Sequence, residues 1–190
     1  MLKFFNTNQK SFLNKLDKIL NKRKLEQKKQ SVNIEKILLD VKKQGDKAVI
    51  KYEIKFSKIK PKTKRLRFTR NEISIISKSI DKDLKKSIDL AYTRIKKFHS
   101  KQKFTSFSFI DSFKNNLSYK YSPIDKVGVY VPGGTASYPS TVLMNCIPAK
   151  VAGVKNIYLT TPAFGSKVNP AIIYAAKKCG VKEIYKTGGA

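Results

Sequence analysis

One short motif in this sequence has residue types and spacing that suit ligand binding. Tyr130 to Thr135 reads YVPGGT and follows directly on a β-rich run that starts at Lys126. Adjacent glycines let backbone N–H groups approach a ligand closely, and a helix that begins after such a loop favours an anion. The motif is neither GxGxxG nor GxxxxGK[ST]. It therefore fits a nucleotide or phosphate loop and a tight structural turn equally well.

Side chains for acid–base or metal chemistry are scarce. His99 is the only histidine and lies in a lysine-rich helical stretch, so we interpret it as a structural residue rather than a general base. Cys146 and Cys179 belong to no CxxC pair and have apolar neighbours, which indicates buried free thiols in a reducing compartment. A zinc site normally takes three or four protein ligands. We therefore predict no catalytic residue and no metal ligand among these 190 residues.

The chain is strongly basic, and its charge is unevenly spread. Lys and Arg total 41 against 13 Asp and Glu, a formal net charge of +28, of which +21 precedes residue 126. Because polyanion binding releases counterions, a basic nucleic-acid-binding protein is one hypothesis. However, the excess is lysine spread along predicted helices, with no recognised nucleic-acid-binding motif. We interpret it as solvated surface and expect no specific nucleic-acid partner.

Hydrophobic residues make up 41% and aromatic residues 11% of the chain, as is typical of a globular core. No run approaches the roughly 18 apolar residues of a membrane span. The opening MLKFFNTNQK lacks the apolar region of a secretory signal. We expect a cytoplasmic protein with no membrane association.

The predicted elements divide the chain at residues 125/126. The first part, residues 1–125, is an N-terminal helical region in which apolar residues recur at helical spacing. Gly45 should end one helix, Asp46 should cap the next, and Thr69 with Glu72 has capping-box spacing. Alternating FTSFSFI and NLSYKY predict a β-hairpin. The predicted helices cover residues 12–20, 34–41, 46–56, 69–80 and 81–98, and the predicted hairpin strands cover 104–110 and 116–121.

The second part, residues 126–190, predicts an α/β fold. Strands at 126–131, 157–160 and 183–185 alternate with helices at about 140–152 and 170–178, the first of which Pro148 should kink or break. This order predicts the first βαβαβ of an incomplete doubly wound, Rossmann-like parallel sheet. In such sheets ligands bind beyond the carboxyl ends of the strands, so the chemistry should lie in the loops after Val131, Thr160 and Lys186.

The second part also carries a specific resemblance. YVPGGTA, PSTVLM, PAKVAGV and GVKEIYKTGGA occur in the order found in histidinol dehydrogenases, which residues 126–190 closely resemble. Earlier, VKKQGDKAVIKYEIKF resembles the QGD-containing helix pair of that family, and AYTRIKKFHSKQ resembles its RI..FH..Q helix. The resemblance extends over nearly the whole chain and is weakest over residues 1–30.

The resemblance implies a zinc-dependent, NAD-linked enzyme, homodimeric at full length, that oxidises L-histidinol through the aldehyde to L-histidine at the end of histidine biosynthesis. In that family Zn²⁺ holds the substrate, and a Glu-His pair that lies later in the chain does the acid–base work. We therefore expect an N-terminal fragment that is inactive by itself. An alternative is a related dehydrogenase acting on another alcohol, such as a sulfonated diol, because substrate choice lies mainly beyond these residues.

Only a few residues of this chain can be matched to the binding site of the family. Tyr130 matches a position that contacts NAD in the family. Gly133, Gly134 and Thr135 follow the same strand, and we predict that they lie near the cofactor or substrate.

Overall fold

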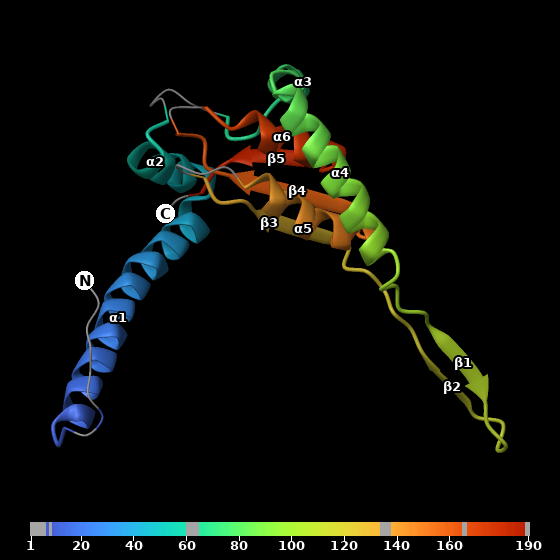
Figure 1. Cartoon of the computed structure of the whole chain (residues 1–190), viewed down its shortest axis with the longest axis horizontal. Coiled ribbons are helices and arrows are strands. Elements are labelled where there is room, and N and C mark those ends of the chain that lie inside the picture. The colour runs from blue at the N-terminus through green and yellow to red at the C-terminus, as the bar shows by residue number, and fades with distance from the viewer. Residues whose placement is uncertain (1–6, 8, 60–64, 134–137, 165–166, 189–190) are drawn as a thin grey trace. The chain divides into compact units, whose positions relative to one another are not determined.

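The computed structural model describes residues 7, 9–59, 65–133, 138–164 and 167–188, without the side chains of 22–33. The chain divides into two compact units, Met1–Val49 and Ile50–Ala190 (Figure 1). The division predicted from composition at residue 125 stays a prediction.

The first unit consists mainly of one long helix. α1 (Phe12–Gln44) is continuous over 33 residues, where two separate helices were predicted. The intervening stretch contains neither Gly nor Pro and is rich in Lys and Gln, which are good helix formers. Gly45 ends α1 as predicted, with φ 57° and its N–H bonded to the Val41 carbonyl. None of the helices in the described part of the chain, long as α1 is, combines the length and apolarity needed to cross a membrane.

Capping or acidic residues mark where each of the next three helices begins. α2 (Asp46–Phe56) starts at Asp46, so the predicted cap is itself the first helical residue and its carboxylate complements the helix dipole. α3 (Arg70–Lys78) has the predicted capping box between Thr69 and Glu72. α4 (Lys82–His99) is capped by Asp81, whose carboxylate accepts from the N–H groups of Asp83 and Leu84.

The predicted hairpin is present and exposed. β1 (Phe107–Ile110) pairs antiparallel with β2 (Asn116–Tyr119), and every position of both strands is exposed. Rings pack on each other along it, with the Phe107 and Tyr119 centroids 4.2 Å apart.

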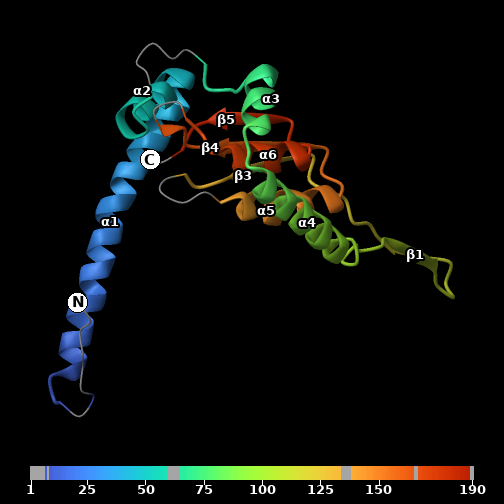
Figure 2. The same cartoon turned by 45° about the horizontal axis from the view of Figure 1, so that its top comes forward.

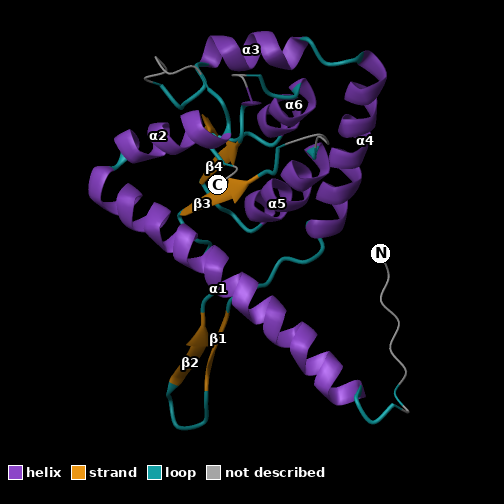
Figure 3. Cartoon of the chain, turned by 90° about the vertical axis from the view of Figure 1, so that its left-hand side faces the viewer, coloured by secondary structure: helices purple, strands orange, loops and turns teal. Residues whose placement is uncertain are grey.

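A parallel βαβαβ unit comes next along the chain, which confirms the predicted fold class. Its strands lie in the order β3-β4-β5, all parallel. α5 and α6 pack on each other along one face of the sheet, with α3 and α4 outside them (Figures 2 and 3). The five elements are β3 (Lys126–Tyr130), α5 (Pro139–Val151), β4 (Asn156–Thr161), α6 (Pro170–Lys178) and β5 (Glu183–Lys186).

The core lies between this sheet and its helices. One row of buried residues crosses the sheet from strand to strand: Val129 pairs with Leu159, which pairs with Ile184. Cys146 and Cys179 are buried free thiols, as predicted. A hydrogen bond with Cys179 and burial raise the pKa of Cys146. Pro148 lies inside α5 without ending it, since the helix continues to Val151.

An ion pair connects α3 to the end of β5. Lys186 Nζ lies 2.8 Å from Glu72 Oε1 and 4.4 Å from the centre of the Phe68 ring. Burial opposes ionisation of Glu72, but hydrogen bonds from Lys186 and Thr69 outweigh it and lower the pKa of this carboxyl to about 2. This pair holds α3 against β5 and thus contributes to the packing of the outer helix layer.

Acid should weaken the fold partly through Glu72. Its pKa is about 2 in the folded protein against an ordinary 4.5, so its contribution to the free energy of unfolding is present above the ordinary value and is lost as pH falls toward 2. Between about pH 5 and pH 2 we expect wild type to lose more stability than Glu72→Gln, which lacks this titration. Chemical denaturation measures the difference. Asp83→Asn, which removes a carboxylate that is 89% exposed, is the control; equal pH slopes for wild type and Glu72→Gln would contradict the expectation.

Candidate functional site

The loops after the three strands meet at one edge of the sheet. Tyr130 pairs with Thr160 in register, and Thr160 pairs in turn with Tyr185, so the strands end level with one another. Val131 N–H donates to the Thr160 carbonyl at 2.9 Å and extends the pairing by one residue. The predicted loops after β3, β4 and β5 therefore lie together at the carboxyl edge of the sheet.

Two glycines allow these loops to pack closely. A Cβ on Gly188 would lie 2.6 Å from Tyr130 Cε2, and a Cβ on Gly133 would lie 2.7 Å from Pro162 Cγ. Gly188 also has φ 143°, a conformation that favours glycine. The Tyr130 ring thus rests on the Gly188 backbone, and 49% of this residue stays exposed. An exposed aromatic ring beside close-packed backbone can bind a flat, polar ligand.

α2 adds buried polar groups to this edge. Glu53 Oε1 accepts hydrogen bonds from Thr187 Oγ1 at 2.8 Å and from Gly188 N at 2.7 Å. Ser57 Oγ donates to the Gly188 carbonyl at 3.0 Å. α2 lies at the end toward which the arrows of β4 and β5 point (Figure 1). Both side chains are buried, and their hydrogen bonds join α2 and the residue after it to the loop after β5.

Glu53 and Ser57 were missed by sequence reasoning. The one local signal is that Glu53 stands four residues after Val49, on the same face of the helix. Of the predicted site residues, the structure brings Tyr130 and Gly133 to this edge. Gly134 and Thr135 lie outside the described residues.

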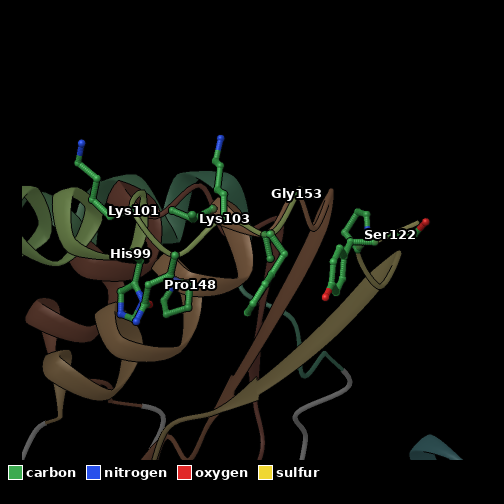
Figure 4. A pocket seen from close by; sticks show the side chains of 12 residues that line it. His99, Lys101, Lys103, Ser122, Pro148 and Gly153 are labelled. Atoms are coloured by element: carbon green, nitrogen blue, oxygen red, sulfur yellow. The ribbon is translucent and has the colours of Figure 1, made fainter. Parts of the chain in front are cut away.

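A cavity lies away from these loops. A cavity of about 980 Å³ is bounded by the end of α4, the ends of the hairpin segment and the end of α5, with His99, Lys101, Lys103, Ser122, Pro148 and Gly153 in its wall (Figure 4). Its wall includes residues that precede β3 and β4, whereas doubly wound sheets bind ligands at the other end of the strands. His99 Nδ1 lies 2.6 Å from Gln102 Oε1, a partner that suits the structural role predicted for this histidine. The strand-end loops remain the better candidate.

The described residues do not suit zinc. Within them, no three His, Cys, Asp or Glu side chains gather in a way that could hold a metal ion. A zinc site needs three or four such ligands. The carboxyl edge offers glycine backbone, hydroxyl groups and an aromatic ring instead, a set that suits an organic cofactor.

Comparison with known families decides which proteins this chain is related to. The family model described as histidinol dehydrogenase matches residues 20–190. The chain belongs to the histidinol dehydrogenase family.

Individual members of the histidinol dehydrogenase family agree with this assignment. Histidinol dehydrogenase of Pelagibacter ubique (strain HTCC1062) is 51% identical over 192 aligned residues, which cover 100% of this chain and 43% of the relative. Histidinol dehydrogenase of Caldanaerobacter subterraneus subsp. tengcongensis is 38% identical over 192 aligned residues, which cover 100% of this chain and 44% of that relative. The chain thus spans less than half the length of these relatives.

A solved structure in the family has the same fold. The crystal structure of histidinol dehydrogenase from Elizabethkingia anophelis superposes with a TM-score of 0.77 at 38% sequence identity. The match covers 84% of this chain and 36% of that one. The family predicted from YVPGGT and the motifs after it is confirmed.

The packing of Gly188 on Tyr130 can be tested by adding one methyl group. Gly188→Ala places a Cβ 2.6 Å from the ring at φ 143°, so we expect a loss of about 1–3 kcal/mol of stability. Gly128→Ala is the matched control, because a Cβ at Gly128 meets nothing within 4 Å. Thermal unfolding should show Tm lowered by several degrees for Gly188→Ala alone. Equal Tm values for the two variants would show that the contact is not tight.

Proposed function

We propose that this chain belongs to an NAD-linked dehydrogenase that oxidises L-histidinol through the aldehyde to L-histidine, the last step of histidine biosynthesis. The family match over residues 20–190 supports the activity. So does the name histidinol dehydrogenase carried by a relative 51% identical over the whole chain. The activity is proposed for the whole enzyme, of which these residues correspond to less than half.

The observation that carries the NAD assignment is the half-exposed Tyr130 ring held against Gly188 at the carboxyl edge. Doubly wound sheets bind nucleotides at this edge, where backbone N–H groups of glycine loops can approach phosphates. Tyr130 and Gly133 would hold the cofactor; Gly134 and Thr135, predicted from the sequence to share this role, lie outside the described residues. When bound, NAD supplies the hydride acceptor. The residues of this chain bind and orient it.

Zinc, the acid–base residues and the partner subunit complete the proposal. Because the described residues do not suit a metal, we assign Zn²⁺ and the proton-transferring groups to parts of the whole enzyme beyond these 190 residues. We propose a homodimer in the cytoplasm. The two buried free thiols agree with a reducing compartment.

Removal of the Tyr130 ring should weaken NAD binding. Loss of one aromatic contact of about 1.4 kcal/mol corresponds to a tenfold higher Kd. Isothermal titration of NAD⁺ into wild type and Tyr130→Ala measures the change. Tyr119→Ala is the matched control, because Tyr119 is 47% exposed against 49% for Tyr130 but lies in the hairpin. An unchanged Kd for Tyr130→Ala, or an equal loss for both variants, would contradict the role of Tyr130.

The isolated 190-residue chain should not turn over histidinol. Within the described residues no metal-binding cluster gathers, so we expect no histidinol-dependent NADH formation even with added Zn²⁺. NADH fluorescence measures this, with the intact relative from Pelagibacter ubique as the positive control. Sustained turnover by the chain alone would show that these residues contain the catalytic groups after all.

A further inference from the structure

Glu53 is an unusual residue at the carboxyl edge because its carboxylate is deeply buried. The residue is 5% exposed. Burying a carboxylate is strongly unfavourable unless it is hydrogen-bonded, so its partners indicate what it does. Both partners of Oε1, the Thr187 hydroxyl and the Gly188 N–H, belong to the loop after β5. No other element shares this oxygen among the hydrogen bonds of the described residues.

The loop after β5 is held from two elements. Both backbone groups of Gly188 are bonded from the end of α2, since Glu53 accepts from the Gly188 N–H and Ser57, the residue after the helix, donates to the Gly188 carbonyl at 3.0 Å. β4 holds the preceding residue, because Thr160 Oγ1 donates to the Thr187 carbonyl. The N–H and the carbonyl of Gly188 are therefore both held by hydrogen bonds.

The fixed backbone of Gly188 sets the position of Tyr130. There is no room for a Cβ between Gly188 and the ring, which a Cβ would approach to 2.6 Å, and Pro162 Cδ would lie 3.2 Å from the same Cβ. A shift of the loop would move the surface on which the ring rests. A continuous set of contacts thus runs from Glu53 through Gly188 to Tyr130.

The second carboxylate oxygen shows that fold stability alone does not explain Glu53. Glu53 Oε2 is buried without a hydrogen-bond partner among the described residues. A buried polar atom without a partner costs free energy, so this oxygen lowers the stability of the fold. Such a group in a native structure calls for an explanation, and the orientation of Gly188 provides one.

We propose that Glu53 is a positioning residue of the cofactor site, which holds Gly188 so that Tyr130 can receive NAD. This inference rests on the proposed function. Glu53 does not touch the reacting atoms; it acts through Gly188. Its role requires an acceptor oxygen rather than a charge, so glutamine should replace it and alanine should not.

Amide exchange combined with NAD titration tests the inference on the 190-residue chain. In Glu53→Ala we expect Gly188 N–H to exchange at least about tenfold faster relative to Leu159 in the core, and the Kd for NAD⁺ to rise about tenfold. Glu53→Gln should stay within about threefold of wild type in both. Asp89→Ala is the matched control. It removes a carboxylate bonded to Tyr174 and Lys178 but remote from the loop, and should change neither.

The other outcomes distinguish failure of the positioning role from failure of NAD binding. If the exchange ratio of Gly188 to Leu159 is the same in wild type and Glu53→Ala, Glu53 does not hold the loop and the inference is overturned. If exchange accelerates while the Kd is unchanged, the positioning role is overturned and NAD binding stands. If wild type does not bind NAD⁺, the proposed function fails and the inference falls with it, whereas the exchange ratios still show whether Glu53 orders Gly188.

Discussion

The parallel register of β3, β4 and β5 is the constraint on which the candidate site depends. Val129, Leu159 and Ile184 lie side by side and are buried, so a slip of one residue would turn this apolar row to the opposite face of the sheet. The same register brings Tyr130 level with Thr160. Three loops therefore leave the sheet at one edge, and the position of the site is a consequence of the core.

Local signals in the sequence predicted the elements, whereas the contacts between distant elements could not be predicted. The capping box of Thr69 and Glu72 and the Pro170 start of α6 depend on neighbouring residues, and both are present. Glu53 and Gly188 are 135 residues apart, and periodicity in α2 carries no information about the partner of its carboxylate. The predicted helices covered too little of α1 for a related reason: apolar stripes mark the packed faces, while a polar helical stretch lacks that signal.

Many of the lysines that give the chain its charge have specific structural contacts. Lys186 lies over Phe68 and pairs with Glu72, and Lys178 pairs with Asp89 at 2.8 Å and lies over Tyr92. Such side chains place their alkyl stems on apolar surface and keep the charge near water. The lysines behind the net charge of +28 therefore lie at the surface, and some of them also take part in side-chain packing. The family, by contrast, is identified by YVPGGT and the other motifs of residues 126–190.

The most direct test of the site is a map of backbone amide shifts in the ¹⁵N-labelled chain during titration with NAD⁺. If the cofactor binds at the carboxyl edge, the largest shifts will cluster at Tyr130, Gly133, Thr187 and Gly188. Shifts that cluster instead at His99, Gln102 and Phe104 would place the ligand in the cavity beside α4 and α5, and would contradict the assignment of the strand-end loops to NAD.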